Sequence, residues 1–198
     1  MNAIVSKKRP TGSATVADLL ALPERDRHEL VDGELVEKEA GNGRHGQAQV
    51  SLAILLRGYR GSGGGGRGPG GWLFGSEVLV QFSGSQVRMP DVAGWKRERL
   101  PAMPNEVPVT VIPDWICEIL STRRGEDLVT KMRLYHQSRV PHYWVIDPEA
   151  ETLAVFRWQE DGYLHVLGAE RADIVRAEPF DALELAVGVL FGDDDESL

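Results

Sequence analysis

The segment from Pro113 to Asp147 constrains the fold most, because it has the pattern of a strand, a helix and a second strand. Asp114–Leu120 and His142–Ile146 are short apolar runs of strand length, and Val140-Pro141 ends the helix between them. Three apolar residues at i, i+4 and i+7 predict the buried face of that helix: Leu128, Met132 and Tyr135. The segment therefore predicts an α/β protein built around this unit.

Glu118 is the first candidate for a functional residue, because it interrupts the first of these apolar runs near its end. A charged residue in a strand that otherwise reads as buried must be paired or must bind a cation. The lone cysteine, Cys117, lies beside it in sequence. We interpret it as a small buried side chain, since no base that would activate a thiol is evident near it.

The chain has 198 residues, of which 42% are hydrophobic and 26% charged, and this composition suits one globular domain. We expect a basic tail over residues 1–13, the domain over 14–191 and an acidic tail over 192–198. No apolar run approaches the ~18 residues of a membrane span, and the absence of a secretory signal predicts a cytoplasmic protein with no membrane partner. The net charge of −8 counts against a protein that coats nucleic acid but does not exclude a nuclease.

Turn residues predict the N-terminal part of the chain. Asp32-Gly33 is typical of a two-residue hairpin, in which Glu29 would oppose Val36. Residues 61–71 are so rich in glycine that we expect a surface loop. The helices expected elsewhere are Val16–Leu22, His45–Tyr59 and a short terminal helix within Leu183–Phe191.

Four further strands are expected: Trp72–Phe82, Val87–Gly94, Thr152–Trp158 and Tyr163–Leu167. The second of them contains Pro90, which has no N–H for a strand ladder, so this strand should lie at an edge or be bulged there. The last two should form a β-meander at the edge of the core.

Three residues on successive elements combine into a candidate metal site: Asp91, Glu118 and Lys131. Two carboxylates from neighbouring strands can hold Mg²⁺ or Mn²⁺, hard cations that take oxygen ligands at about 2.0–2.1 Å. Such a metal activates a water molecule and neutralises charge on a phosphodiester, and the lysine can position the water or stabilise the developing charge. Asp114 is a poorer partner, because four residues of strand place it roughly 13 Å from Glu118.

These residues carry a resemblance to a known family. The segments RMPDVAG around Asp91, WICEILS around Glu118 and EDLVTKMRLY around Lys131, followed by VPHYWVIDPE, resemble the Uma-two family of the PD-(D/E)XK, or restriction-endonuclease-like, superfamily. The similarity extends from about Asp18 to about Phe191 and includes the early hairpin. It implies an α/β core with a mixed central sheet and a Mg²⁺-dependent phosphodiesterase site at these three residues.

The chain departs in one place from the superfamily's usual Glu-x-Lys pattern, in which lysine would stand where this sequence has Leu120. The Uma-type proteins resemble this chain in having a lysine on the following helix, so Lys131 is the substitute, and its long stem lets the amine reach back toward Glu118. The resemblance also places a glutamate in the first hairpin. There Glu29 would approach the site as an extra metal ligand, or as a base that contacts the metal ligands and not the metal itself.

Each candidate also has a plain structural interpretation. Lys131 follows Asp127 by four residues, a spacing common in ion pairs on helix surfaces. Asp91 follows a proline and is compatible with a turn, and Glu29 is compatible with a surface position in its hairpin. His45 opens its helix on the apolar side, where it either contacts substrate near the metal or serves as a core or capping residue.

Together these features predict a single-domain endonuclease that uses Mg²⁺ to hydrolyse phosphodiester bonds of nucleic acid. We expect DNA rather than RNA as the substrate. Small nucleases often pair to cut two strands, so we expect a homodimer. Two other classes stay open on the sequence alone. One is a catalytically inactive module with the nuclease fold that binds nucleic acid or protein, and the other is a carboxylate-pair hydrolase of sugars that needs no metal.

Overall fold

The computed structural model describes residues 12–23, 26–61, 69–121 and 126–194. Their central element is a six-stranded sheet in the order β10-β9-β8-β7-β6-β3, in which β7 and β8 are parallel and the other neighbours are antiparallel. The strands are β3 (Trp72–Ser76), β6 (Val92–Lys96), β7 (Trp115–Ile119), β8 (His142–Asp147), β9 (Thr152–Gln159) and β10 (Gly162–Glu170). The predicted α/β fold with a mixed sheet is confirmed, and β8, β9 and β10 form the expected meander at one edge.

A helical crossover joins the parallel strands β7 and β8, since parallel neighbours cannot be connected by a tight turn. It contains a π-helical segment, η2 (Glu126–Lys131), that continues directly into α3 (Met132–Gln137). Tyr135 is buried as predicted, but the prediction that Leu128 is buried is wrong, because this residue is 40% exposed. A π-helical turn holds more residues than an α-helical turn, so the predicted spacing does not keep Leu128 on the face of Tyr135.

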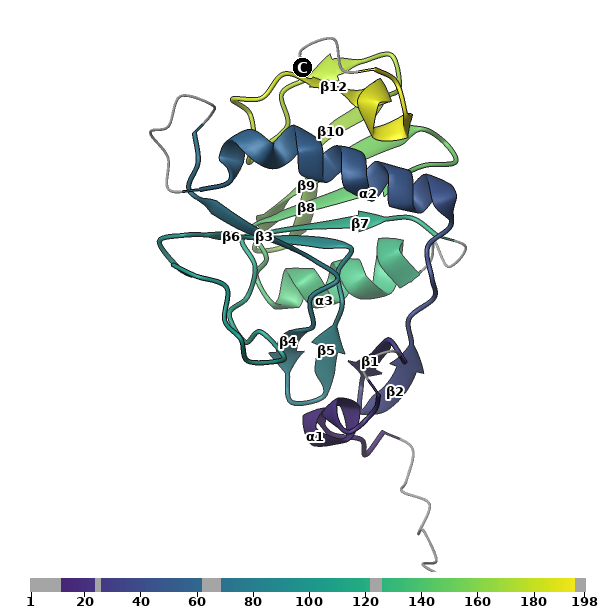
Figure 1. Cartoon of the computed structure of the whole chain (residues 1–198), viewed down its shortest axis with the longest axis vertical. Helices are drawn as coiled ribbons and strands as arrows, with labels where there is room; N and C mark the ends of the chain where they lie inside the picture. Colours follow the sequence, from purple (N-terminus) through teal and green to yellow (C-terminus); the bar gives the residue numbers. More distant parts are fainter. Residues whose placement is uncertain (1–11, 24–25, 62–68, 122–125, 195–198) are drawn as a thin grey trace, which may run out of the picture.

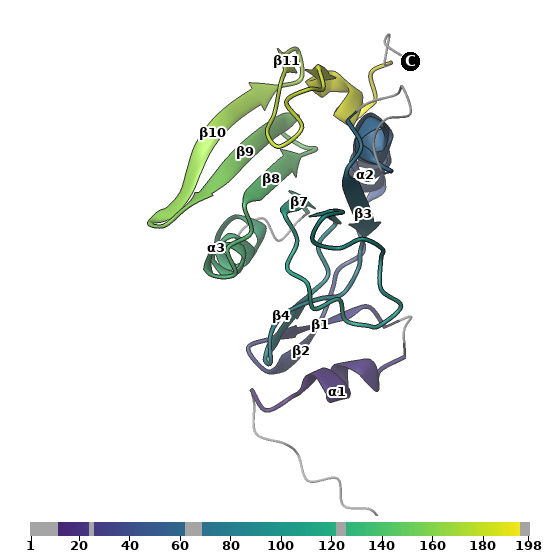
Figure 2. The same cartoon turned by 90° about the vertical axis from the view of Figure 1, so that its left-hand side faces the viewer.

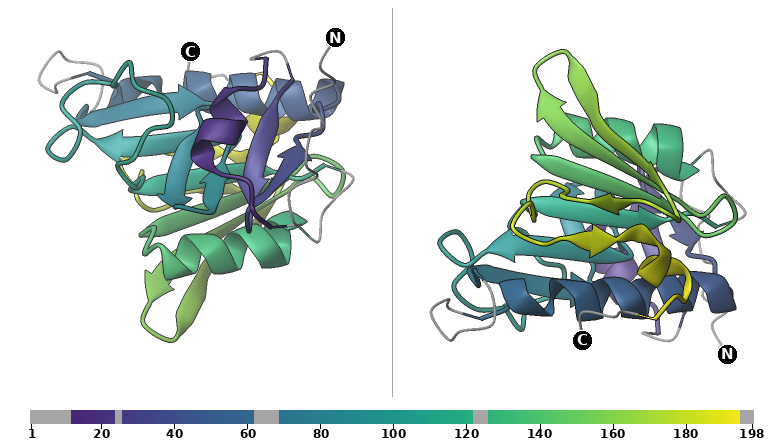
Figure 3. Two further views of the ribbon diagram at one scale, coloured as in Figure 1. Left: turned by 90° about the horizontal axis from the view of Figure 1, so that it is seen from below. Right: turned by 90° about the horizontal axis from the view of Figure 1, so that it is seen from above.

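Two helices cover opposite faces of the central sheet (Figure 1, Figure 3). On one face lies α2 (Gly43–Leu55) with its 3₁₀ extension η1 (Leu56–Tyr59), and on the other lies α3. Successive residues of a strand point to opposite sides of the sheet. In β7, Cys117 belongs to the core under α2, whereas Ile116 belongs to the core that contains Tyr135 of α3. Glu118 alternates in the same way and therefore faces α3.

A second, four-stranded sheet in the order β2-β1-β5-β4 lies with α1 at the N-terminal end of the molecule (Figure 1, Figure 2). Its elements are α1 (Val16–Leu20), β1 (His28–Val31), β2 (Glu34–Glu37), β4 (Val80–Ser83) and β5 (Gln86–Arg88). The predicted hairpin is confirmed together with its register, because Glu29 opposes Val36. Asp32 and Gly33 have φ values of 49° and 78°, the positive values that a two-residue hairpin turn requires.

Two segments that we predicted as single strands, Trp72–Phe82 and Val87–Gly94, are instead divided between the two sheets. The first breaks around Glu77, whose φ of 54° is incompatible with a strand, and the second breaks at Pro90, which has no N–H for a ladder. The strand after the proline is not an edge strand, because β6 pairs with both β3 and β7. Asp91 consequently lies where the chain passes from one sheet to the other.

The C-terminal part of the chain completes the core under α2. β11 (Ile174–Val175) pairs with β12 (Leu185–Ala186), and η3 (Val187–Phe191) packs against α2, so the predicted short terminal helix is present as a 3₁₀ helix that follows a short strand. Parts of the predicted tails and of the glycine-rich loop, residues 1–11, 62–68 and 195–198, lie outside the described residues. Asp193 pairs with Arg171 at 2.5 Å. No helix in the described ranges is long and apolar enough to cross a membrane.

Replacing Leu52 by alanine should lower the free energy of unfolding by about 2–5 kcal/mol, because Leu52 is fully buried under α2 and the change leaves a cavity. Val50→Ala on the same helix is the matched control, since Val50 is 59% exposed and its truncation should change stability by less than about 0.5 kcal/mol. Urea unfolding followed by circular dichroism measures both. Equal losses in the two variants would contradict this packing of α2.

Candidate active site

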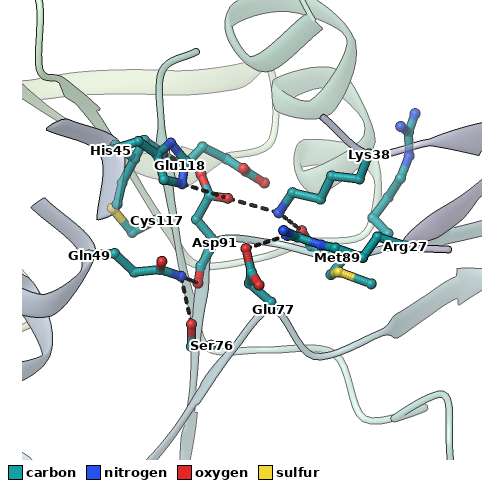
Figure 4. A network of polar contacts seen from close by, with 12 residues as sticks. Arg27, Lys38, His45, Gln49, Ser76, Glu77, Met89, Asp91, Cys117 and Glu118 are labelled. Atoms are coloured by element: carbon teal, nitrogen blue, oxygen red, sulfur yellow. Dashed lines mark hydrogen bonds and ion pairs between the residues drawn. The ribbon is translucent and has the colours of Figure 1, made fainter. Parts of the chain in front are cut away.

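Asp91, the carboxylate at the junction of the two sheets, is buried and held from several elements. Its Oδ2 accepts a hydrogen bond from the backbone N–H of Ile119 in β7, and its Oδ1 accepts one from the Lys38 ammonium, both at 2.8 Å. The Nε2 of His45, in the first turn of α2, lies 3.5 Å from the same Oδ1. Figure 4 shows Lys38, His45 and Gln49 converging on Asp91.

The surroundings of Asp91 keep it ionised although it is buried. Burial by itself raises the pKa of a carboxyl group, since it removes water from the charged form. The contact with His45 and the positive charges of Lys38 and Lys131 act in the opposite direction and outweigh burial, so the pKa of Asp91 lies well below its usual value. Asp91 is therefore a carboxylate at neutral pH, which is the form that binds a cation.

Glu118 is completely buried in the central sheet, on the face that α3 covers. Lys131 donates to its Oε2 at 2.9 Å, and the Tyr135 hydroxyl donates to its Oε1 at 2.5 Å. Burial raises the pKa of Tyr135 well above its usual value and the negative charge of Glu118 adds to this, so the hydroxyl remains a donor. Lys131 thus reaches Glu118 as expected and is buried rather than part of a helix-surface pair; the side chain of Asp127 lies outside the described residues.

The carboxylates of Asp91 and Glu118 belong to neighbouring positions of the sheet. β6 and β7 pair with Val92 opposite Cys117, so Asp91 lies opposite Glu118, one residue beyond the paired stretch. Directly opposed residues share a face of a sheet, with Cβ atoms about 4.5–5.5 Å apart. A cavity of about 40 Å³ opens beside Asp91 and is also lined by Lys38, Lys131, His45 and Glu29. This volume admits a few water molecules, or a cation in place of one.

Glu29 lies at the same cavity but is engaged by the backbone and by an arginine. Its Oε1 accepts the N–H of Met89 at 2.7 Å, and its Oε2 accepts a hydrogen bond from the fully buried Arg88 at 3.1 Å. The interpretation of Glu29 as a surface residue is therefore wrong. Its contacts fix the chain immediately before Asp91, so Glu29 helps to set the position of that carboxylate.

The residues at the site fit a divalent cation such as Mg²⁺. Asp91 and Glu118 offer hard carboxylate oxygens, the type of ligand that Mg²⁺ prefers. Across the parts of the chain that the structure describes, no group of three or more His, Cys, Asp and Glu residues is arranged to hold a metal ion. Two carboxylates suffice for Mg²⁺, which keeps several waters and takes further oxygens from substrate phosphates.

Three residues at the site were not predicted there from the sequence: Lys38, Gln49 and Tyr135. Gln49 donates to the backbone carbonyl of Asp91 at 2.8 Å and lies four residues after His45, a spacing that places both on one helix face. Tyr135 likewise follows Lys131 by four residues, so these two also share a helix face. Lys38 carries no such signal, because a lysine between two glutamates is typical of a solvated segment.

Two other residues near these strands have structural surroundings of their own. Asp114 immediately precedes β7 and is paired with Arg99 at 2.8 Å and with the backbone N–H of Lys96 at 2.9 Å. Cys117 belongs to the core under α2, where burial raises the pKa of its thiol well above the usual value. Neither residue is placed to bind the same metal ion as Glu118.

A mixed sheet between two helices, with one carboxylate in β7, a second immediately before β6 and a lysine on the crossover helix, defines a restriction-endonuclease-like α/β protein. The sequence model of one family, described as "Uma2: Putative restriction endonuclease", matches residues 16–188. The chain belongs to the Uma2 family.

A solved structure has the same fold. It is described as "Crystal structure of a putative nuclease belonging to DUF820" and comes from Anabaena variabilis. It is 24% identical to this chain, with a TM-score of 0.66, and the match covers 89% of this chain and 97% of that one. No curated protein matches the sequence.

Replacing Lys131 by methionine should destabilise the protein by about 3–5 kcal/mol, because it leaves the Glu118 carboxylate buried without its cation. Tyr135→Phe removes one hydrogen bond to the same carboxylate and should cost about 1–3 kcal/mol. Arg133→Met is the matched control, since Arg133 is exposed on the same helix. If Lys131→Met lowered the urea midpoint no more than Arg133→Met, the pairing of Lys131 with Glu118 would be contradicted.

Proposed function

We propose that this Uma2 protein is a metal-dependent endonuclease that hydrolyses phosphodiester bonds of DNA with Mg²⁺ or Mn²⁺. The observation that carries the proposal is the presence of two buried carboxylates side by side, Asp91 immediately before β6 and Glu118 in β7, with the Lys131 ammonium against Glu118. The description of the Uma2 family and that of the similar Anabaena structure both support a nuclease.

Each residue of the site has a proposed task. Asp91 and Glu118 would hold the metal, which supplies an activated water and neutralises charge on the scissile phosphate. Lys131 lines the cavity, so its ammonium is placed to orient the attacking water or to stabilise charge on the phosphate. His45 also lines the cavity, so its ring is placed to contact a substrate beside Asp91.

The setting of the reaction is part of the same proposal. A homodimer would present two sites, one for each strand of a DNA duplex. A cytoplasmic location suits Cys117, a free and buried thiol that a reducing compartment preserves.

A catalytically inactive module that binds nucleic acid or protein is the second candidate. The observation that favours it is that Lys38 and Lys131 already neutralise the two carboxylates within the protein. A hydrolase of sugars has less support. Its two acids would stand across an open cleft, whereas Asp91 and Glu118 are buried side by side, one just before β6 and the other in the adjacent strand β7.

Titration calorimetry with Mn²⁺, followed by plasmid nicking, tests the proposal. Wild type should bind Mn²⁺ saturably, and Asp91→Asn and Glu118→Gln should each lose both binding and nicking, because each replaces an anionic ligand by a neutral amide of similar shape. Asp114→Asn is the matched control: it changes a buried aspartate that pairs with Arg99, and it should keep both properties. Binding by wild type without any nicking would favour the inactive module, and no binding by wild type would overturn the metal site.

A further inference from the structure

The Lys38 ammonium occupies a position at Asp91 that a bound cation would need. It donates to Asp91 Oδ1 at 2.8 Å and to the backbone carbonyl of Met89 at 2.6 Å. Both acceptors are oxygens, and the Lys38 side chain is only 12% exposed and lines the cavity beside Asp91. A positive charge held between a carboxylate and a carbonyl has the surroundings of a hard metal ion.

Three carboxylates at or beside the cavity each have a cation as partner, and Glu37 and Glu39 also line it. Asp91 is paired with Lys38, Glu118 with Lys131, and Glu29 with Arg88. A divalent cation that entered this arrangement would add two positive charges where the carboxylates are already neutralised. Like charges at such short range in a poorly solvated site repel strongly, so a metal ion at Asp91 is favoured when the resident cation of that carboxylate moves away.

Lys38 is the resident cation that can leave. Arg88 is fully buried, and Lys131 is buried on the crossover helix with its amine on a completely buried carboxylate. Lys38 instead lies just after β2, in the connection to α2, and its side chain is more exposed than that of Lys131, so its flexible four-carbon stem can turn toward solvent. Once it has moved, Asp91 Oδ1 and the Met89 carbonyl are both free to accept a new cation.

We propose that Lys38 is an internal cation that neutralises Asp91 in the metal-free protein and is exchanged for the divalent metal ion when that ion binds. The inference rests on the metal site of the proposed function and deepens it. Lys38 stabilises the empty site and weakens the apparent affinity for metal, because the ion must replace a hydrogen bond to a charged group. Lys38 thus sets the concentration of metal ion at which the site becomes occupied.

The variant Lys38→Met keeps the length of the side chain and removes the charge. It should bind Mn²⁺ about tenfold to hundredfold more tightly than wild type in titration calorimetry, and its melting temperature without metal should be lower. Lys96→Met is the matched control, because it removes the same charge from the exposed far end of β6 and should leave the affinity unchanged. Affinity in Lys38→Met that is equal to or weaker than that of Lys96→Met would overturn the exchange.

A measurement on wild type keeps the inference testable if Lys38→Met does not fold. Reductive methylation read out by mass spectrometry reports how accessible each amine is. Saturating Mn²⁺ should speed the labelling of Lys38 severalfold and leave Lys96 unchanged. Labelling of Lys38 that stays constant or slows while Mn²⁺ binds would show that the ammonium remains on Asp91, which overturns the exchange.

The outcomes separate this inference from the proposed function. If Mn²⁺ binds to wild type, is lost in Asp91→Asn and is unaffected by Lys38→Met, the metal site stands and the exchange falls. If neither wild type nor Lys38→Met binds Mn²⁺, both fall. If Lys38→Met binds more tightly and no variant nicks DNA, the exchange stands and the nuclease activity falls.

Discussion

A fully buried carboxylate in the central strand, Glu118, imposes a requirement that the rest of the structure meets. An unpaired charge at this depth would be unfavourable by several kcal/mol, so the core around β7 can form only if a cation and a donor come with it. Both come from the crossover helix, as Lys131 and Tyr135 one turn apart. The change from π-helical to α-helical geometry falls at Lys131, the residue that must reach the carboxylate.

The same solution recurs around the cavity at the junction of the two sheets. Asp91 and Glu29 also pair with cations, Lys38 and Arg88. The three cations differ in how deeply they are buried. Two of the cations are in the core, and the third belongs to a connecting segment beside the cavity. In the proposed exchange, the pair between Asp91 and Lys38 is the one that a bound metal ion would replace.

The local patterns in the sequence predicted the centre of the fold. The β7–α3–β8 unit, the hairpin at Asp32-Gly33 and the C-terminal meander depend on periodicity and turn residues that lie within short windows, and all three are present. The candidate residues Asp91, Glu118 and Lys131 were found because a charge in an apolar strand is unusual and because the family resemblance joined them. These features require no knowledge of distant contacts.

The features that the sequence did not predict depend on distant contacts. Nothing local shows that the strand after Trp72 leaves one sheet for another, because that depends on which partners β3 and β4 find. Lys38 meets Asp91 across more than fifty residues of chain, and no spacing rule connects them. Leu128 was misplaced because a π-helical turn cannot be distinguished from an α-helical one by apolar spacing alone.

The crossing of the chain between the two sheets has a mechanical consequence. The chain passes between the two sheets twice, around Glu77 and at Pro90-Asp91. The backbone N–H of Glu77 is shared between the carbonyls of Pro90 and Asp91, so hydrogen bonds join the two crossing segments at one point. The N-terminal sheet carries Glu29, and the segment that follows its hairpin carries Lys38, whereas Glu118 and Lys131 stay with the central sheet. Any tilt of the N-terminal sheet about this point would therefore move Glu29 and Lys38 relative to Glu118 and Lys131, while Asp91 keeps its hydrogen bond to β7.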